Sequence, residues 1–157
     1  MFRLFKTLFR ILMLILIIGL AVICYARYIE PHMLQEKYYT VESPLVTESA
    51  ENLKIAVFGD THFGDYYNIE DFKKVLDSLE EMKPDIVVFS GDLIDNYDNY
   101  TGSADEISLS LSEIEAPYGK YAVFGNHDYG GGAENKYQAI LESGGFTVLK
   151  NQYFAID

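Results

Sequence analysis

The sequence contains little cysteine and, after residue 27, few basic residues. Its one cysteine, Cys24, lies inside an apolar run, so a disulfide framework and a cysteine–metal site are excluded from the rest of the chain. Four of the 12 Lys and Arg residues lie in residues 1–27, which leaves 8 basic against 24 acidic residues and a charge of −16 beyond them. This charge disfavours nucleic acid and anionic membrane surfaces as partners, because both bind mainly cationic patches. It attracts divalent cations.

An uncharged apolar run covers residues 11–26. Its 16 residues are slightly short of the about 17–25 that span a bilayer, but residues 7–9 extend it if the Arg10 side chain reaches the headgroups. A basic start followed by an apolar run is also typical of a cleaved signal peptide. Because the run lacks an Ala-x-Ala cleavage pattern, we expect residues 1–27 to be a cytoplasmic tip and an uncleaved signal anchor. The basic residues before the run place the remainder outside the cytoplasm.

The part of the chain after the anchor divides into a tether and a domain. Residues 28–52 carry two prolines and no sustained periodicity, which predicts a tether in which His32 is a solvated linker histidine. From 53 to 157, short apolar runs alternate with amphipathic segments, which predicts an α/β domain with a largely parallel sheet. The expected strands cover 53–58, 86–89, 121–124, 146–149 and 153–156. The expected helices are one capped by Asn68 and ended by Pro84, one opened by a Ser103–Glu106 capping box and stopped by Pro117, and one over 133–143.

Three polar clusters directly follow the first three expected strands. They are Gly59-Asp60-Thr61-His62, Gly91-Asp92-Leu93-Ile94-Asp95 and Gly125-Asn126-His127-Asp128. A single Gly-Asp is typical of an ordinary turn. The carboxyl ends of parallel strands, however, line the ligand crevice of an open α/β sheet. Three such clusters, each with side chains that bind metals, therefore predict a metal site at that rim.

The order and spacing of these clusters resemble the signature of the calcineurin-like metallophosphoesterases. The flanking segments LKIAVFGDTHFG, KPDIVVFSGDLID and APYGKYAVFGNHDYGGG resemble the membrane-associated bacterial branch of that family. The resemblance covers residues 53 to about 150. It implies the N-terminal half of an αββα sandwich, preceded by one transmembrane helix. It also implies metal-dependent hydrolysis of phosphomonoesters or phosphodiesters.

The resemblance also implies a ligand set for two metal ions. Asp60 and His62 would bind the first ion, Asp92 would bridge both ions, and Asn126 would bind the second through its amide oxygen. Oxygen and nitrogen ligands together suit Mn, Fe or Zn better than Ca, and the residues do not choose among those three.

Two further residues receive catalytic roles from the resemblance. His127 would contact the phosphate and protonate the leaving oxygen, and Asp95 would form a hydrogen bond with His127 and orient it. No protein nucleophile is expected, in keeping with the absence of a Gly-x-Ser-x-Gly elbow and a Walker-type loop. Tyrosines follow each cluster, and either a substrate-binding lip or ordinary solvent-facing loops would explain them. They are Tyr66, Tyr67, Tyr97, Tyr100 and Tyr129.

The sequence departs from the family pattern in two ways. Asn96 stands where many members have Arg, and the later Gly-His and Gly-His-x-His motifs are absent. We therefore expect 53–157 to be a domain truncated at its C-terminus, inactive alone, with the apolar faces of its sheet partly uncovered. Two alternatives stay open. One is a metal-binding or interaction protein without turnover, and the other is a hydrolase of a nucleotide-linked lipid or cell-envelope precursor.

Overall fold

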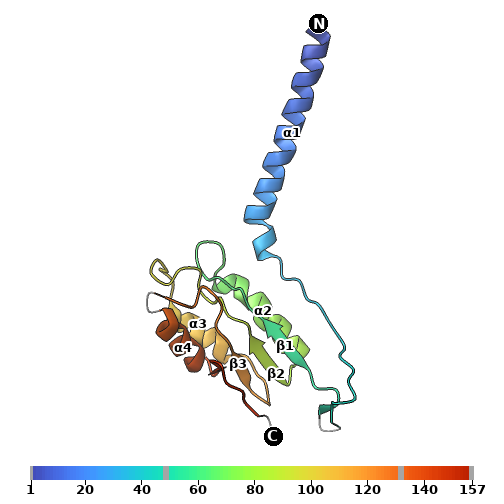
Figure 1. Ribbon diagram of the computed structural model, residues 1–157. Helices are drawn as coiled ribbons and strands as arrows, with labels where there is room; N and C mark the ends of the chain where they lie inside the picture. The colour runs from blue at the N-terminus through green and yellow to red at the C-terminus, as the bar shows by residue number, and fades with distance from the viewer. Residues whose placement is uncertain (1, 48–49, 131–132, 156–157) are drawn as a thin grey trace. The chain divides into compact units, whose positions relative to one another are not determined.

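The computed structural model describes residues 2–47, 50–130 and 133–155. The chain divides into two compact units, Met1–Gln35 and Glu36–Asp157 (Figure 1).

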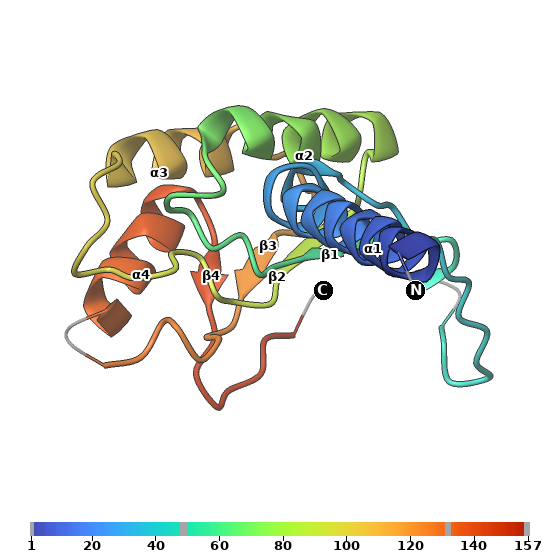
Figure 2. The ribbon, with the colours of Figure 1, turned by 90° about the horizontal axis from the view of Figure 1, so that it is seen from above.

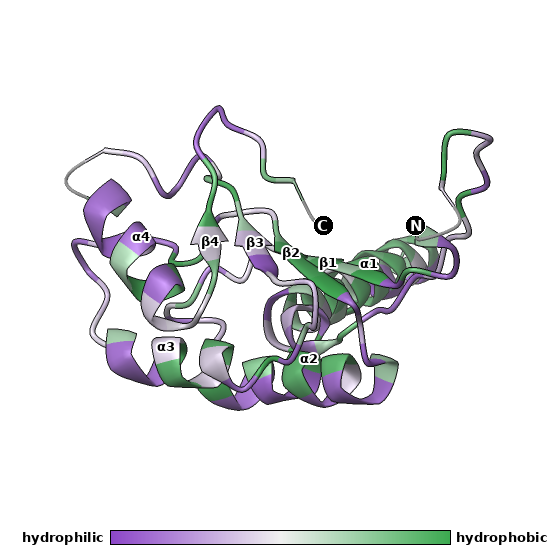
Figure 3. Cartoon of the chain, turned by 90° about the horizontal axis from the view of Figure 1, so that it is seen from below, coloured by the Kyte–Doolittle hydropathy of each residue, from purple (hydrophilic) through white to green (hydrophobic). Residues whose placement is uncertain are grey.

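The first unit is a long apolar helix. Helix α1 spans Phe2–Tyr28 and is followed by the short 3-10 helix η1, Glu30–His32. Figure 3 colours α1 mostly green, for hydrophobic residues, and none of its residues is buried. At about 1.5 Å per residue the helix is about 40 Å long, which exceeds the about 30 Å of a bilayer's hydrocarbon core. By length and composition it can cross a membrane, a test that an N-terminal signal sequence also passes.

The second unit is built on a four-stranded parallel sheet. Its strands are β1 (Ile55–Phe58), β2 (Ile86–Phe89), β3 (Lys120–Ala122) and β4 (Thr147–Val148), in the order β1-β2-β3-β4. All three neighbouring pairs are parallel, which confirms the predicted α/β class. The strand expected at 153–156 was wrong for its described residues, 153–155, which lie outside any strand; Ile156 lies outside the described residues. The ring of Phe154 packs instead on Tyr121, with 5.3 Å between the ring centroids.

Local signals in the sequence mark where two of the helices begin. Helix α2 spans Ile69–Met82, and the Asn68 side chain accepts hydrogen bonds from the first-turn amides in a full capping box. Helix α3 spans Ala104–Ser112, and the Ser103 hydroxyl accepts from the amide of Glu106, which is one of the two bonds of the predicted box. Helix α4 spans Ala133–Ser143, as predicted.

The helices cover one face of the sheet. Figure 2 shows α2 and α3 on the same side of the strands, with α4 beside α3. Phe72 of α2, Leu111 of α3 and Tyr137 of α4 pack with Val87 and Phe89 of β2 in one buried core. On the opposite face, the apolar side chains of Ile55 and Val57 are 55% and 66% exposed. The expected exposure of apolar sheet faces is therefore found on this face, whereas the helices cover the other.

Two glycines let the loops after β2 and β3 approach each other closely. Gly91 has a φ of +97°, and a Cβ built there would lie 2.7 Å from the Cα of Gly125. A side chain at position 91 would therefore push the two loops apart and would also adopt a backbone conformation that L-residues disfavour.

We predict that Gly91→Ala destabilises the protein more than Gly130→Ala does. Gly130 shares the positive φ, at +87°, but a Cβ there meets nothing within 4 Å. Gly130→Ala should cost about 1–2 kcal/mol of backbone strain, whereas Gly91→Ala should cost a further about 1–3 kcal/mol from the overpacked contact. Chemical unfolding followed by circular dichroism measures both values. Equal losses would show that the loops separate at no cost.

Candidate metal centre

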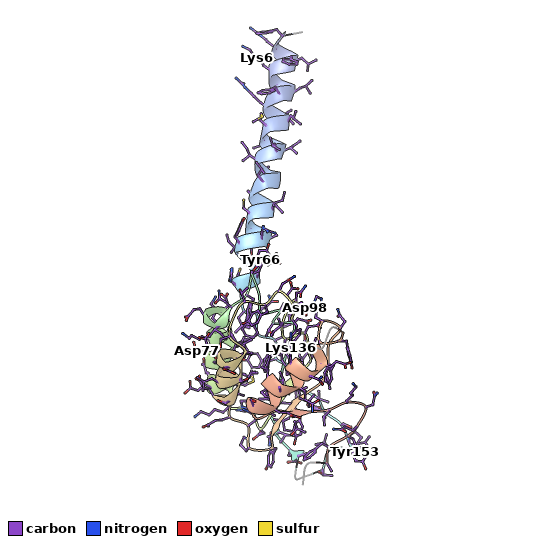
Figure 4. All side chains as sticks on the ribbon, turned by 90° about the vertical axis from the view of Figure 1, so that its left-hand side faces the viewer. Lys6, Tyr66, Asp77, Asp98, Lys136 and Tyr153 are labelled. Atoms are coloured by element: carbon purple, nitrogen blue, oxygen red, sulfur yellow. The ribbon has the colours of Figure 1, made fainter. Side chains whose placement is uncertain are left out.

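The loops that follow β1 and β2 are joined by hydrogen bonds. The amide of His62 donates to the carbonyl of Asp92 (3.1 Å), and the amide of Phe63 donates to the carbonyl of Leu93 (2.8 Å). The buried Thr61 hydroxyl also donates to the Leu93 carbonyl, at 3.0 Å. These bonds hold the first two polar clusters at one rim of the sheet. Figure 4 labels Tyr66 and Asp98, which lie just beyond the two loops at the same end of this unit.

Three of the four predicted metal ligands converge at this rim. Asp60, His62 and Asp92 each offer a donor atom, and the three atoms lie within 4.8 Å of one another. All three residues have left-handed backbones, with φ of 51°, 43° and 59°. Non-glycine residues rarely adopt this conformation, and such strain concentrates at functional sites. The fold therefore maintains an unfavourable backbone in order to bring these donors together.

Asp92 occupies the centre of the rim. Its side chain is buried, and Oδ1 accepts a 2.7 Å hydrogen bond from the amide of His127. This bond links the loop after β3 to the loop after β2. Asn126, the fourth predicted ligand, precedes His127 on that loop and is exposed.

The donor chemistry fits a bound cation. The His62 ring turns Nε2 toward Asp60, whose Oδ1 atom lies 3.9 Å away, which is too far for a hydrogen bond. Carboxylate oxygens and imidazole nitrogens together form ligand sets typical of Zn, Mn or Fe.

His127 is oriented by the backbone of Asp95. Its Nδ1 lies 2.7 Å from the Asp95 carbonyl oxygen, whereas the Asp95 carboxylate oxygen is 3.7 Å from the same nitrogen. Since a carbonyl only accepts, we assign the proton to Nδ1, which leaves Nε2 as the acceptor in the neutral ring. The hydrogen bond to the carbonyl, with the neighbouring carboxylates, raises the pKa of His127 above its ordinary value.

Asp128 has a structural role that the sequence reasoning missed. Its carboxylate is fully buried and accepts hydrogen bonds from the amides of Asp92 (2.7 Å), Leu93 (3.1 Å) and Gly125 (2.8 Å). The hydroxyl of Tyr97 donates a fourth bond, at 3.0 Å. The loops after β2 and β3 are therefore fastened to one charge. The only signal in the sequence was an aspartate that ends the third cluster without an assigned ligand role.

Tyr97 faces inward, so it is not an ordinary solvent-facing loop residue. Burial, followed by the nearby Asp128 carboxylate, raises the pKa of its phenol, which therefore stays protonated and able to donate. Its ring also lines a cavity of about 400 Å³ between the loop after β2 and helices α3 and α4.

Comparison with known proteins agrees with this geometry. A sequence model of the calcineurin-like phosphoesterase family matches residues 53–156. The chain belongs to that family, as its motifs predicted.

Three curated relatives resemble most of the chain. The chain is 43% identical over 129 residues to the uncharacterized metallophosphoesterase YkuE of Bacillus subtilis. It is 29% identical over 119 residues to a transmembrane protein with metallophosphoesterase domain of Danio rerio. It is also 29% identical over 105 residues to the UDP-2,3-diacylglucosamine pyrophosphatase LpxG of Chlamydia trachomatis. These matches cover 82%, 74% and 67% of this chain and 45%, 26% and 31% of the relatives. The chain thus spans less than half the length of each.

We predict that Tyr97→Phe lowers the free energy of unfolding by about 1.5–3 kcal/mol, because it removes a hydrogen bond to a buried charge. Tyr100→Phe is the matched control. Tyr100 lies on the same loop and lines the same cavity, but its hydroxyl bonds no described residue. Its removal should change stability by less than about 0.5 kcal/mol. Urea unfolding of both variants provides the comparison, and equal effects would refute the role assigned to the Tyr97 hydroxyl.

Proposed function

We propose that the protein is a membrane-anchored hydrolase of phosphate esters that works with two metal ions. The observation that carries this proposal is the convergence of Asp60, His62 and Asp92 at the carboxyl ends of two adjacent parallel strands. Membership of the calcineurin-like phosphoesterase family supports the reaction class.

The proposed ligands divide between two ions. Asp60, His62 and Asp92 would hold the first ion, and Asp92 with Asn126 would contribute to the second. Bound metal ions supply a hydroxide at neutral pH and stabilise the attacking and leaving oxygens of an in-line displacement. The buried position of Asp92, fixed by the amide of His127, keeps its carboxylate in place to serve both ions.

His127 is the proposed proton donor. With Nδ1 fixed on the Asp95 carbonyl, Nε2 is the atom that binds and releases a proton. A raised pKa favours the protonated ring near neutral pH, where it can protonate the leaving oxygen of the ester. Asp95 acts through its backbone, so many side chains at position 95 preserve the orientation of the ring.

The substrate class is proposed from the anchor and from one relative. A catalytic domain held at a membrane meets lipid-linked substrates, and the Chlamydia trachomatis relative is named as a pyrophosphatase of UDP-2,3-diacylglucosamine, a nucleotide-linked lipid. A nucleotide-linked lipid or envelope precursor is therefore the narrower proposal. Metal binding without hydrolysis in the assay below would favour the rival, a metal-binding protein without turnover.

We predict that Asp92→Asn reduces metal-dependent hydrolysis of a chromogenic phosphodiester by more than about 100-fold, because loss of even an outer-shell partner of a metal site costs about 10–100-fold. Asp95→Asn should cost less than about tenfold, since it keeps the carbonyl that orients His127. Mn²⁺ affinity, measured on the same samples, should fall for Asp92→Asn alone. Equal, mild losses from both changes would contradict the bridging role.

We also predict that the domain lies outside the cytoplasm, because the basic residues precede the apolar run. The test replaces Cys24 by Ser and the exposed Asp98 by Cys, so that one cysteine reports on the domain. A membrane-impermeant maleimide should label this cysteine in intact cells. Labelling only after lysis would reverse the orientation.

A further inference from the structure

A second group of metal-binding side chains adjoins the first. His62, Asp95 and His127 each offer a donor atom, and these atoms lie within 4.8 Å of one another. Asp95 and His127 belong to no ligand set in the proposed mechanism. Two imidazoles and one carboxylate form a ligand set that zinc enzymes use.

Two of the three donor spacings are close to those around a tetrahedral ion. The Asp95 Oδ1 atom lies 3.5 Å from Nδ1 of His62 and 3.7 Å from Nδ1 of His127. Both distances are longer than a hydrogen bond. Zinc bonds of about 2.0–2.2 Å at tetrahedral angles separate neighbouring ligands by about 3.3–3.6 Å. Closure of the three side chains onto one ion would complete such a site.

Each donor is also available to an ion. Nδ1 of His62 is buried without a hydrogen-bond partner among the described residues, and it faces Asp95. The Asp95 side chain is 63% exposed and that of His127 is 36% exposed, so an ion can enter and keep a water as its fourth ligand. Binding at Nδ1 of His127 replaces the proton that this nitrogen shares with the Asp95 carbonyl, and the exposed position of Asp95 lets water take over that bond.

We propose that His62, Asp95 and His127 form a zinc site distinct from the Asp60–His62–Asp92 group. The two sites share His62 through different nitrogens, because Nε2 lies 3.9 Å from Asp60 and Nδ1 lies 3.5 Å from Asp95. A neutral imidazole has one unprotonated nitrogen, so it serves one ion at a time. Zinc at the new site therefore competes with the first metal and also occupies His127. This consequence for catalysis rests on the proposed function, whereas zinc binding itself does not.

The test measures Zn²⁺ binding by the full chain in detergent micelles, with a chelator dye as competitor. Asp60→Asn removes one ligand of the first group and serves as the background. Adding His127→Gln or Asp95→Asn to that background should raise the Kd for Zn²⁺ at least about tenfold, because direct ligands matter at least as much as their outer-shell partners. Adding Asp98→Asn, an exposed acid on the same loop, is the matched control and should leave the Kd unchanged.

The outcomes separate the possibilities. Tight binding by Asp60→Asn that is lost with His127→Gln or Asp95→Asn supports the new site. An unchanged Kd in both double variants, or loss of zinc binding in Asp60→Asn alone, overturns it. Because Asp60, Asp95 and His127 are exposed, the variants should fold, which circular dichroism verifies. Metal-dependent hydrolysis is measured in a separate assay. If the protein does not hydrolyse phosphate esters, the Kd values for Zn²⁺ still test the new site.

Discussion

The metal-binding rim depends on the buried carboxylate of Asp128. A charge in the protein interior costs several kcal/mol unless it is well paired. Here three backbone amides and one phenol donate to it, and the amides come from the loops after both β2 and β3. The carboxylate thus joins two loops that are distant in sequence. Asp92 is the residue placed by this arrangement, because its amide binds Asp128 while its side chain faces the rim.

The other loops of the rim are connected to the hydrogen bonds that Asp128 accepts. The loop after β1 is joined to the loop after β2 by backbone bonds, so all three loops form one connected set. Within this set, Asp60, His62 and Asp92 retain left-handed backbones that would relax in a free chain. The close approach of the Gly91 and Gly125 backbones leaves no room for a side chain between these two loops. Such preorganisation keeps the donors in place before any ion arrives, and it explains why a shared histidine can face two donor groups.

Much of this architecture could be predicted from the sequence. Asn68 and Ser103 marked helix starts because capping is a local interaction, and the clusters after three apolar runs indicated the rim because parallel strands end on one side. Contacts between segments that are distant in the sequence were harder to predict. The sequence indicated a link between Asp95 and His127, but a backbone carbonyl forms it, and no residue type encodes that choice. Asp128 and Tyr97 were missed for a related reason. The residue type alone does not show whether an aspartate is buried and bound by amides or exposed.

Amide hydrogen exchange on the metal-free chain tests most directly whether Asp128 holds the loops together. The amides of Asp92, Leu93 and Gly125 donate to one carboxylate, so they should exchange as slowly as the amides of strand β2 and should all accelerate together in Asp128→Ala. Exchange as fast as in residues 37–42, which lie outside any helix or strand, would contradict the account. So would unequal effects of Asp128→Ala on the three amides.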